Sequence, residues 1–256
     1  MNQKIIELLS QLKLSGMLKD AEDILMEAEK NGSATEDVLL ELLETEHRQR
    51  QSIFLYNRLK NAALPEEWTL DTFPFHQQTS INKIQIMNLA KLNFIERHEN
   101  IVFIGDTGTG KSGLAMSLIR QAILNGYRCK FFNAQTLLDD LYASLADHRS
   151  SRLMKQLLNY DLIAIDELGY LNLSEEKINM FFKLIDMRYR KKPTIITTNL
   201  PFEEWYGVFK QKSLVDALLD RIKHYCIVIN ISGKSLRDPA KDEAIQSSPI
   251  SRSKKT

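Results

Sequence analysis

The sequence contains few cysteines and no long apolar segment. Its 256 residues include two cysteines, Cys129 and Cys226, in apolar, strand-like runs without the spacing of a metal-binding cluster. We interpret them as buried free thiols, which is typical of a reducing compartment. No apolar run approaches the ~20 residues of a membrane span. The charges of Lys4 and Glu7 also come too early for a secretory signal. We therefore expect a soluble, cytoplasmic protein without a membrane partner.

The sequence also lacks an excess of charge of either sign. It has 34 Lys and Arg against 33 Asp and Glu, a formal net charge of +1. Any contact with nucleic acid must therefore use a local basic surface. The apolar fraction of 43% is ordinary for a globular protein, so a substantial core is available. The length suits one large domain and one small domain.

A glycine-rich stretch follows the apolar run at 101–104 and precedes a helical pattern at 114–119. Strand, loop and helix in this order are the context of a phosphate-binding loop, in which backbone N–H groups and the helix N-terminus face a phosphate. Lys111 would reach the β- and γ-phosphates of ATP, and the Ser112 hydroxyl would ligate Mg²⁺. A purely structural turn is the alternative. The predicted nucleotide-binding residues are Gly105, Asp106, Thr107, Gly108, Thr109, Gly110, Lys111, Ser112 and Gly113.

Strands alternate with helices after residue 100. Further strand-like runs lie at 128–132, 162–165, 194–199 and 226–231, with helical patterns between them. This alternation predicts an α/β fold, with a five-stranded parallel sheet flanked by helices.

Polar residues follow two of these strands, where ligands of open parallel sheets bind. Asp166 would hold Mg²⁺ together with Ser112, and Glu167 would polarise a water that attacks the γ-phosphate. Asn199 would orient that water. The alternatives are an ordinary surface Asp-Glu pair and, for Asn199, a turn residue ahead of Pro201.

The chain divides into regions of different character. Residues 1–64 show successive helical patterns without strand-like alternation and predict a small all-helical N-terminal domain. Residues 65–80 indicate an aromatic-rich linker, in which Phe73 and Phe75 would either pack beside an adenine or dock onto the next domain. The ATPase domain is predicted over 81–237. The polar segment 238–256 indicates a disordered tail.

Three basic features each have two interpretations. The last N-terminal helix carries His47, Arg48, Arg50, Arg58 and Lys60. The run 188–192 is also basic. Both sets are candidates for contact with DNA phosphates. The alternative for the helix is an ordinary solvated face, and the alternative for 188–192 is a basic complement to a helix C-terminus. Arg221 would either pair with Asp216 or Asp220, or act as a catalytic arginine supplied to a neighbouring subunit's γ-phosphate.

Several motifs together resemble the IstB family of insertion-sequence ATP-binding proteins, relatives of the DnaC helicase loader within the AAA+ ATPases. They are Gly-x-x-Gly-Thr-Gly-Lys-Ser at 105–112, Ile-Asp-Glu-Leu-Gly-Tyr at 165–170, Thr-Thr-Asn at 197–199, Ala-Leu-Leu-Asp-Arg-Ile at 217–222 and Gly-Lys-Ser-Leu-Arg at 233–237. The similarity spans about residues 1–237. The chain departs from the family at Ser112-Gly113, where Thr-His is usual, and at Leu236, where Tyr is usual.

The resemblance implies a bacterial, ATP- and Mg²⁺-dependent helper of DNA transposition with an AAA+ sheet and no C-terminal lid. Its subunits would assemble on duplex DNA largely independently of sequence, select a target and recruit the cognate transposase. Hydrolysis would then reset the assembly. Lys111, Glu167, Asn199 and Arg221 would be catalytic, and the homo-oligomer would share its active sites between subunits. The alternatives are a DnaC-like helicase loader and a nucleotide-dependent switch with negligible turnover.

Overall fold

The computed structural model describes residues 2–169, 171, 173–209 and 212–237. The chain divides after Asn61 into two compact units, called here the N-terminal unit and the C-terminal unit. No helix within the described residues is long and apolar enough to cross a membrane. The predicted disordered tail at 238–256, and with it the predicted absence of a C-terminal lid, lies outside the described residues.

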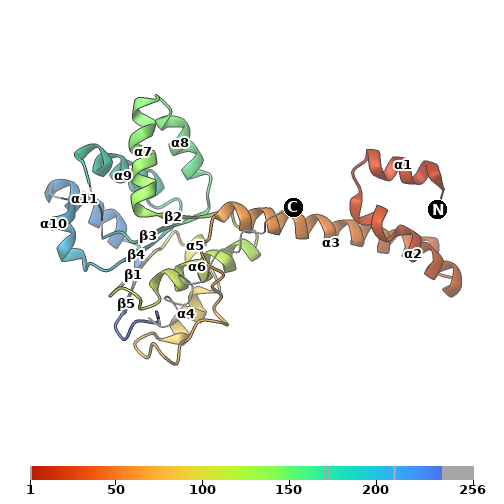
Figure 1. The fold of residues 1–256 in the computed structure, drawn as a ribbon, viewed down its shortest axis with the longest axis horizontal. Coiled ribbons are helices and arrows are strands. Elements are labelled where there is room, and N and C mark those ends of the chain that lie inside the picture. Colours follow the sequence, from red (N-terminus) through yellow and green to blue (C-terminus); the bar gives the residue numbers. More distant parts are fainter. Residues whose placement is uncertain (1, 170, 172, 210–211, 238–256) are drawn as a thin grey trace, which may run out of the picture. The chain divides into compact units, whose positions relative to one another are not determined.

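The N-terminal unit is built from helices (Figure 1). They are α1 (Gln3–Gln11), α2 (Ser15–Asn31) and α3 (Thr35–Ala62), the last of which continues past the division. The Asn2 side chain caps α1 by accepting a hydrogen bond from the backbone N–H of Lys4 at 2.9 Å. Gly32 ends α2 in the left-handed conformation, with φ of 61°. The helical character predicted for this part of the chain is confirmed.

Helices α2 and α3 meet closely at Gly16. A Cβ at this position would lie 2.9 Å from the Cα of Glu46, so the contact requires glycine. The Glu46 carboxylate accepts hydrogen bonds from the backbone N–H groups of Gly16 at 2.8 Å and Met17 at 3.3 Å. Burial opposes ionisation of Glu46, but these bonds and the 2.6 Å ion pair with Arg50 keep its pKa below the ordinary value. Arg50 therefore compensates the charge of a buried carboxylate of its own unit.

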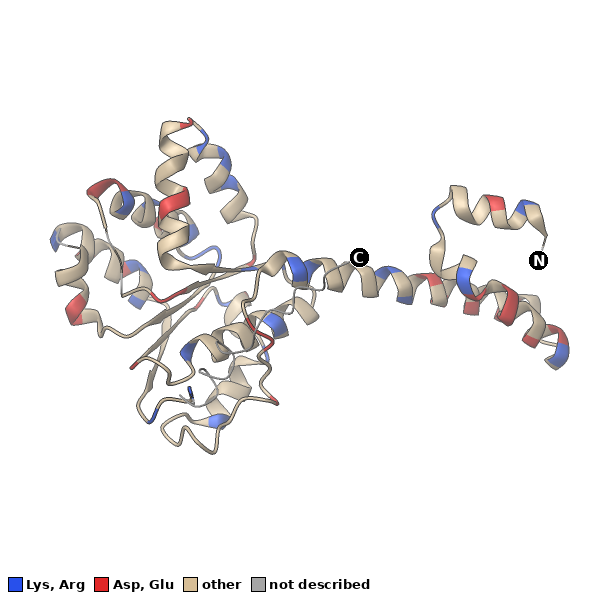
Figure 2. Ribbon diagram, viewed as in Figure 1, with Lys and Arg blue, Asp and Glu red and all other residues tan. Residues whose placement is uncertain are grey.

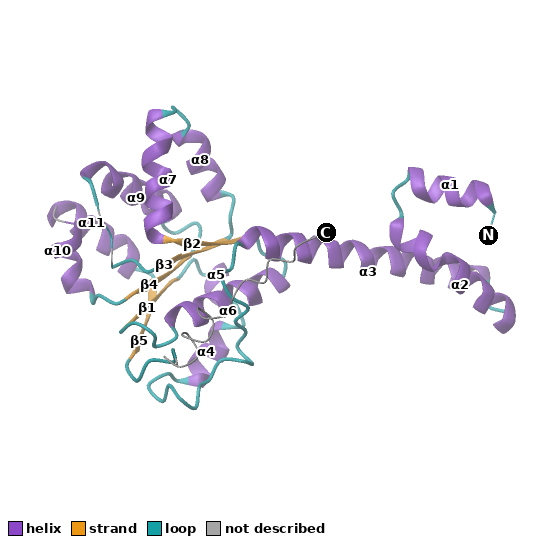
Figure 3. Ribbon diagram, in the orientation of Figure 1, coloured by secondary structure: helices purple, strands orange, loops and turns teal. Residues whose placement is uncertain are grey.

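The C-terminal unit contains the predicted five-stranded parallel sheet (Figure 3). Its strands are β1 (Asn100–Gly105), β2 (Cys129–Asn133), β3 (Leu162–Asp166), β4 (Thr194–Thr198) and β5 (Cys226–Ile231). They lie in the order β2-β3-β4-β1-β5. In this register Ile104 of β1 pairs with Thr198 of β4, and Asn133 of β2 pairs with Asp166 of β3. The carboxyl ends of β1 to β4 thus meet at one edge, where the polar residues that follow them converge.

Helices cover both faces of the sheet (Figures 1 and 3). They are α4 (Lys83–Leu89), α5 (Asn93–Glu96), α6 (Lys111–Leu124), α7 (Ala134–Ala146), α8 (Ser150–Leu158), α9 (Glu175–Arg188), α10 (Trp205–Phe209) and α11 (Lys212–Lys223), with a short 3-10 turn η1 (Phe202–Glu204). Helices α7 to α11 share one core with Ile163, Ile165 and Ile196. Helix α6 packs on β1 to β4 from the opposite face. The helical region predicted around 136–158 is two helices, because His148 adopts a positive φ of 55° between α7 and α8.

The segment predicted as a linker, 65–80, has no helix or strand of its own. It nevertheless packs closely within the C-terminal unit. Phe73 is buried against Gly110, where an added Cβ would lie 2.8 Å from the ring. The fully buried Gln78 donates to the Lys234 carbonyl at 2.6 Å. This segment therefore forms a wall beside the glycine-rich loop.

Candidate functional site

The glycine-rich loop joins β1 to α6, as predicted. Gly108 and Gly110 have positive φ angles of 82° and 95°, which favour glycine. The loop is also enclosed by other chain segments: a Cβ on Gly105 would lie 2.0 Å from the Ile231 carbonyl oxygen of β5. The backbone N–H of Leu236 donates to the Gly108 carbonyl at 2.7 Å. The end of the described chain is thus anchored on the loop.

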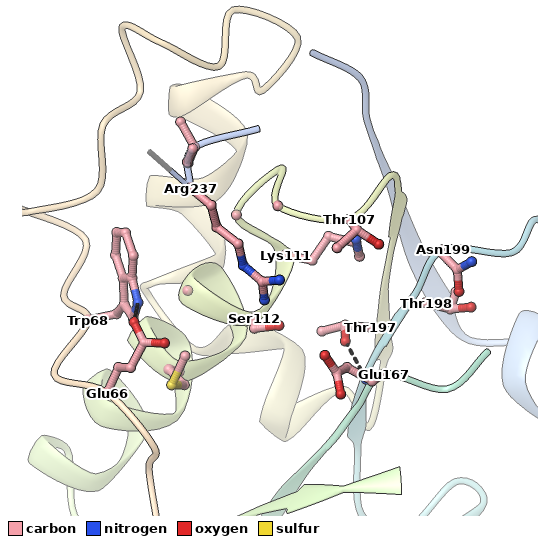
Figure 4. A pocket seen from close by; sticks show the side chains of 15 residues that line it. Glu66, Trp68, Thr107, Lys111, Ser112, Glu167, Thr197, Thr198, Asn199 and Arg237 are labelled. Atoms are coloured by element: carbon pink, nitrogen blue, oxygen red, sulfur yellow. Dashed lines mark hydrogen bonds between the residues drawn. The ribbon is translucent and has the colours of Figure 1, made fainter. Parts of the chain in front are cut away.

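A cavity opens beside this loop at the carboxyl edge of the sheet (Figure 4). Its lining comes from four parts of the chain. The loop and α6 supply Thr107, Gly108, Gly110, Lys111, Ser112, Gly113 and Met116; the strand ends supply Glu167, Thr197, Thr198 and Asn199; the segment before β1 supplies Glu66 and Trp68; and the chain end supplies Leu236 and Arg237. Most of the predicted nucleotide-binding residues and two predicted catalytic side chains beyond the loop therefore surround one space.

Lys111 lies at the start of α6 with its ammonium group held by the loop. Its Nζ donates to the carbonyl oxygens of Gly105 at 2.6 Å and Asp106 at 2.7 Å. Burial lowers the pKa of Lys111, which the negative charges of Asp166 and Asp106 partly offset. The cation at the head of a helix provides a strong site for a phosphate oxygen.

Ser112 and Asp166 meet beneath the cavity. The Ser112 hydroxyl donates to Asp166 Oδ1 at 2.7 Å, and the Thr197 hydroxyl donates to the same oxygen at 2.5 Å. Burial raises the pKa of Asp166, and the neighbouring charge of Glu167 adds to this effect. A divalent cation would offset both the burial of the Asp166 charge and its repulsion from Glu167. The hydroxyl and the carboxylate are hard oxygen ligands and fit Mg²⁺. The described residues hold no cluster of three or more His, Cys, Asp or Glu that could bind a metal ion.

Glu167 lines the cavity and is held by two neighbouring strands. Its backbone lies in the left-handed region with φ of 62°, unusual for a residue with a side chain. Its N–H donates to Thr197 Oγ1 at 2.9 Å, and Asn133 Nδ2 donates to Glu167 Oε2 at 3.1 Å. The hydrogen bonds hold a backbone conformation that costs about 1–3 kcal/mol, at a position where Glu167 lines the cavity. Asn133 was not identified from the sequence, since it resembles an ordinary helix-capping residue.

Asn199 follows β4 and lines the cavity beside Thr198. Its Oδ1 fills the space above Gly169, where an added Cβ would lie 2.1 Å from it. Asn199 therefore occupies the position that the strand-end argument requires.

Sequence reasoning gave no role to several residues that line the other sides of the cavity, among them Trp68 and Arg237. Trp68 stands among polar residues in the segment predicted as a linker, and only its aromatic character gave a signal. Arg237 lies in the Gly-Lys-Ser-Leu-Arg motif without an assigned role. It points toward Lys111 and Ser112 (Figure 4), and its positive charge helps to lower the pKa of Lys111. The cavity therefore contains two cationic side chains.

Arg221, in contrast, does not line this cavity. Its Nε forms an ion pair with Asp186 Oδ1 of α9 at 2.5 Å, and its Nη1 donates to the Ala217 carbonyl at 3.0 Å. The prediction that Arg221 pairs with Asp216 or Asp220 was wrong. Both were chosen because they lie close to Arg221 in sequence, but the fold packs α9 beside α11 and so brings Asp186 to Arg221. Asp216 instead accepts a hydrogen bond from Tyr206 at 2.5 Å.

The basic run 188–192 is only partly available to a ligand. Arg188 is 1% exposed, and its guanidinium donates to the carbonyl oxygens of Leu157, Tyr160 and Pro193. Burial lowers its pKa to about 10. Lys192 pairs with Asp161. The prediction that the whole run forms a DNA surface is therefore wrong for Arg188, which instead ties α8, α9 and the start of β4 together.

Comparison with known proteins identifies the family. Residues 7–244 match the family model described as IstB-like ATP binding protein. The chain belongs to this family. An IstB-like relative from Bacillus thuringiensis subsp. berliner, named as an ATP-binding protein of insertion sequence IS232, is 36% identical over 92% of this chain and 94% of its own length. The corresponding IS21 protein of Pseudomonas aeruginosa is 34% identical over 93% of this chain and 89% of its own length.

Solved structures place the C-terminal unit among AAA+ folds. The DnaC helicase loader gives a TM-score of 0.55 at 25% identity and covers 68% of this chain and 98% of its own. AMPPCP-bound DnaA from Aquifex aeolicus gives a TM-score of 0.57 at 20% identity, and the match covers 72% of this chain and 56% of the DnaA chain. The predicted AAA+ sheet and the family resemblance are both confirmed.

Proposed function

We propose that this IstB-like chain is a Mg²⁺-dependent ATPase that assists DNA transposition. ATP-bound subunits assemble on duplex DNA, select a target and recruit the cognate transposase, and hydrolysis resets the assembly. The observation that carries the proposal is the convergence of Lys111, Ser112 and Glu167 around one cavity, with Asp166 hydrogen-bonded to Ser112 beneath it. The names of the IS232 and IS21 relatives, which join ATP binding to an insertion sequence, support the biological setting.

The chemistry follows from the side chains. Lys111 and the loop N–H groups hold the β- and γ-phosphates, while Ser112 and Asp166 hold Mg²⁺. When bound, Mg²⁺ neutralises charge on the phosphate oxygens. Glu167 polarises the attacking water, and Asn199 orients it. Thr197 bonds both to Asp166 and to the backbone of Glu167, so it keeps the two carboxylates in a fixed relation.

A switch without turnover would not require this second carboxylate. Glu167 stands in a strained backbone conformation, held by Thr197 and Asn133. Such precise placement of a charged group beside a phosphate site favours hydrolysis over binding alone.

The position of Arg221 supports a site shared between subunits. Arg221 lies outside its own chain's cavity, and the side chains of its ion pair with Asp186 are 28% and 47% exposed. A partly solvated pair of this kind contributes little stability, so Arg221 can exchange Asp186 for a phosphate of a neighbouring copy. This exchange would make hydrolysis depend on assembly.

A compact basic surface supports contact with DNA. Arg97, His98, Arg190 and Tyr225 surround one shallow depression at the amino-terminal edge of the sheet. The Arg190 guanidinium lies 5.1 Å from the centre of the Tyr225 ring and donates to its hydroxyl at 3.2 Å. Stacking orients this arginine toward a planar or anionic partner. We propose that these residues bind DNA phosphates, and call them the Arg190 surface.

The basic half of α3 is a second candidate (Figure 2). Arg58 stacks on Phe54 at 4.0 Å, and Lys60 is exposed. Arg48 and Arg50, in contrast, already donate to Thr45 and Glu46. We favour the Arg190 surface, because Arg190 contacts an uncharged tyrosine, whereas the charge of Arg50 is already paired with Glu46.

A DnaC-like helicase loader is the second candidate function, favoured by the likeness to the DnaC structure. The two functions differ in partner. Negative-stain images of the protein with duplex DNA and a non-hydrolysable ATP analogue would show filaments or rings on the duplex if the transposition proposal holds. Assembly only with a replicative helicase would support the loader.

A further inference from the structure

The cavity has two chemically different ends. The polar end, with Lys111, Glu167 and Asn199, is accounted for by the phosphate chemistry of the proposed function. At the other end the lining is Trp68, Met116 and the bare backbone of Gly113, with Glu66 beside them. A nucleotide whose γ-phosphate lies at Glu167 must place its base away from the polar end. An apolar aromatic surface there has the chemistry to bind a base.

Trp68 occupies the space that the glycine leaves free. A Cβ on Gly113 would lie 3.0 Å from Trp68 Cδ2 and 3.3 Å from Cε2 and Cε3. The face of the indole, over its fused bond, thus packs against the first turn of α6, one residue after Ser112. The ring lies at the head of the phosphate-binding helix and is half-buried, which leaves part of it open to the cavity.

Contacts on several sides fix the indole. Its Nε1 donates to Glu66 Oε2 at 2.6 Å. The Trp68 carbonyl accepts a hydrogen bond from Arg120 Nε of α6 at 3.1 Å. The ring centre of Phe73 lies 5.8 Å from that of Trp68, and Phe73 itself packs on Gly110. A ring held in place before the ligand arrives loses little conformational entropy on binding.

We propose that Trp68 is the platform on which the base of the bound nucleotide stacks, with Glu66 as the residue that positions it. The ligand class is a purine nucleoside triphosphate, because a two-ring base covers more of the indole than a pyrimidine does. The inference rests on the proposed function, since the same cavity must hold the triphosphate. It adds a recognition element from the segment before β1, outside the loop and the strand ends.

Titration calorimetry on the full chain tests this with ATP, CTP and inorganic tripolyphosphate. Tripolyphosphate carries the anionic groups without a base. Trp68→Ala should weaken ATP binding by between about fivefold and 150-fold, the range for loss of one base–aromatic stack. The affinities of this variant for ATP and for CTP should become similar. Its affinity for tripolyphosphate should stay that of the parent. Trp68→Phe, which keeps an aromatic face, should retain most of the preference for ATP.

Fluorescence gives a second readout. The chain has two tryptophans, and Trp205 is 1% exposed in the core. ATP should therefore quench the emission of Trp68, tripolyphosphate should not, and Trp68→Phe should remove the effect. Glu66→Gln, which keeps a hydrogen-bond acceptor, should preserve ATP affinity better than Glu66→Ala.

Two outcomes would overturn the inference. One is a folded Trp68→Ala protein with parental ATP affinity. The other is an equal loss of ATP and tripolyphosphate binding, which would give Trp68 only a structural role at the loop. In either case the proposed function stands if the parent binds ATP. Failure of the parent to bind ATP or tripolyphosphate would instead refute the proposed function itself.

Discussion

The hydroxyl of Ser112 donates a hydrogen bond to Asp166 Oδ1 at 2.7 Å, although 54 residues separate them in the chain. This bond joins the head of α6 to the end of β3. It brings together the two oxygen groups that we assign to Mg²⁺. Because Thr197 donates to the same oxygen, three segments of the sheet region converge on one carboxylate.

Substitution of Lys111 tests the phosphate site. Lys111→Ala removes the ammonium group from the loop, so ATP affinity should fall by at least tenfold, about 1.4 kcal/mol. A fluorescence titration with a labelled nucleotide measures the change. Lys91→Ala, on the exposed surface, is the control. Parental affinity in Lys111→Ala would remove the basis of the ATPase proposal.

Substitution of Glu167 separates binding from turnover. Glu167→Gln keeps the shape and loses the charge that polarises water, while Asp166 and Ser112 remain. We expect retained ATP binding and steady-state phosphate release reduced by about a hundredfold or more. DNA assemblies should persist longer in gel shifts. Unchanged phosphate release would mean that Glu167 is an ordinary surface carboxylate.

The contact between Asn133 and Glu167 predicts a weaker effect on the same step. Asn133→Ala removes the 3.1 Å hydrogen bond to Glu167 Oε2 and leaves the carboxylate in place. Phosphate release should fall by less than in Glu167→Gln, with ATP affinity unchanged. Asn133→Asp should be more damaging than Asn133→Ala, because two carboxylates would repel each other. Asn133 also caps α7, so circular dichroism must show that the variants fold.

DNA binding should depend on salt and on the Arg190 surface. Neutralised phosphates release counterions, so log affinity should fall linearly with log salt by about 0.9 for each phosphate contacted. Arg190→Ala should weaken duplex binding and reduce this slope by about one. Lys30→Ala in the N-terminal unit is the matched control. A flat salt dependence, or strong preference for one short sequence, would contradict the proposal.

Mixed assemblies test the shared active site. Arg221→Ala should bind nucleotide nearly normally but fail to hydrolyse it, and specific activity of the parent should rise with protein concentration and duplex DNA. A mixture of Arg221→Ala with Lys111→Ala should recover part of the activity, since some interfaces pair an intact loop with an intact arginine. Asp186→Ala, which removes the intrachain partner, should remain active.

Absence of recovery in assemblies shown by mass to be mixed would refute the shared site. Arg221 would then be the ion-pair partner of Asp186 and no more.

Local sequence determined much of this protein. The glycines of the loop, the apolar strand runs and the helical periodicity are short-range signals, because backbone conformation and the choice of a buried face depend on neighbouring residues. They sufficed to predict five strands, the helical start of the chain and the position of the loop. The rule that parallel strands end at one edge also placed Asp166, Glu167 and Asn199 near Lys111.

Tertiary structure alone decided contacts between segments without a local signature. Nothing near Trp68 or Arg237 in the sequence indicates that they face Gly113 and Lys111, since these contacts depend on how 65–80 and 233–237 fold back over the loop. Arg188 was expected at the surface because it stands in a run of basic residues, and such a run does not show which of its side chains is buried. Its burial follows from three carbonyl groups that only the packed ends of α8, α9 and β4 supply. Asp186, the partner of Arg221, lies 35 residues away and becomes a neighbour only because α9 packs beside α11.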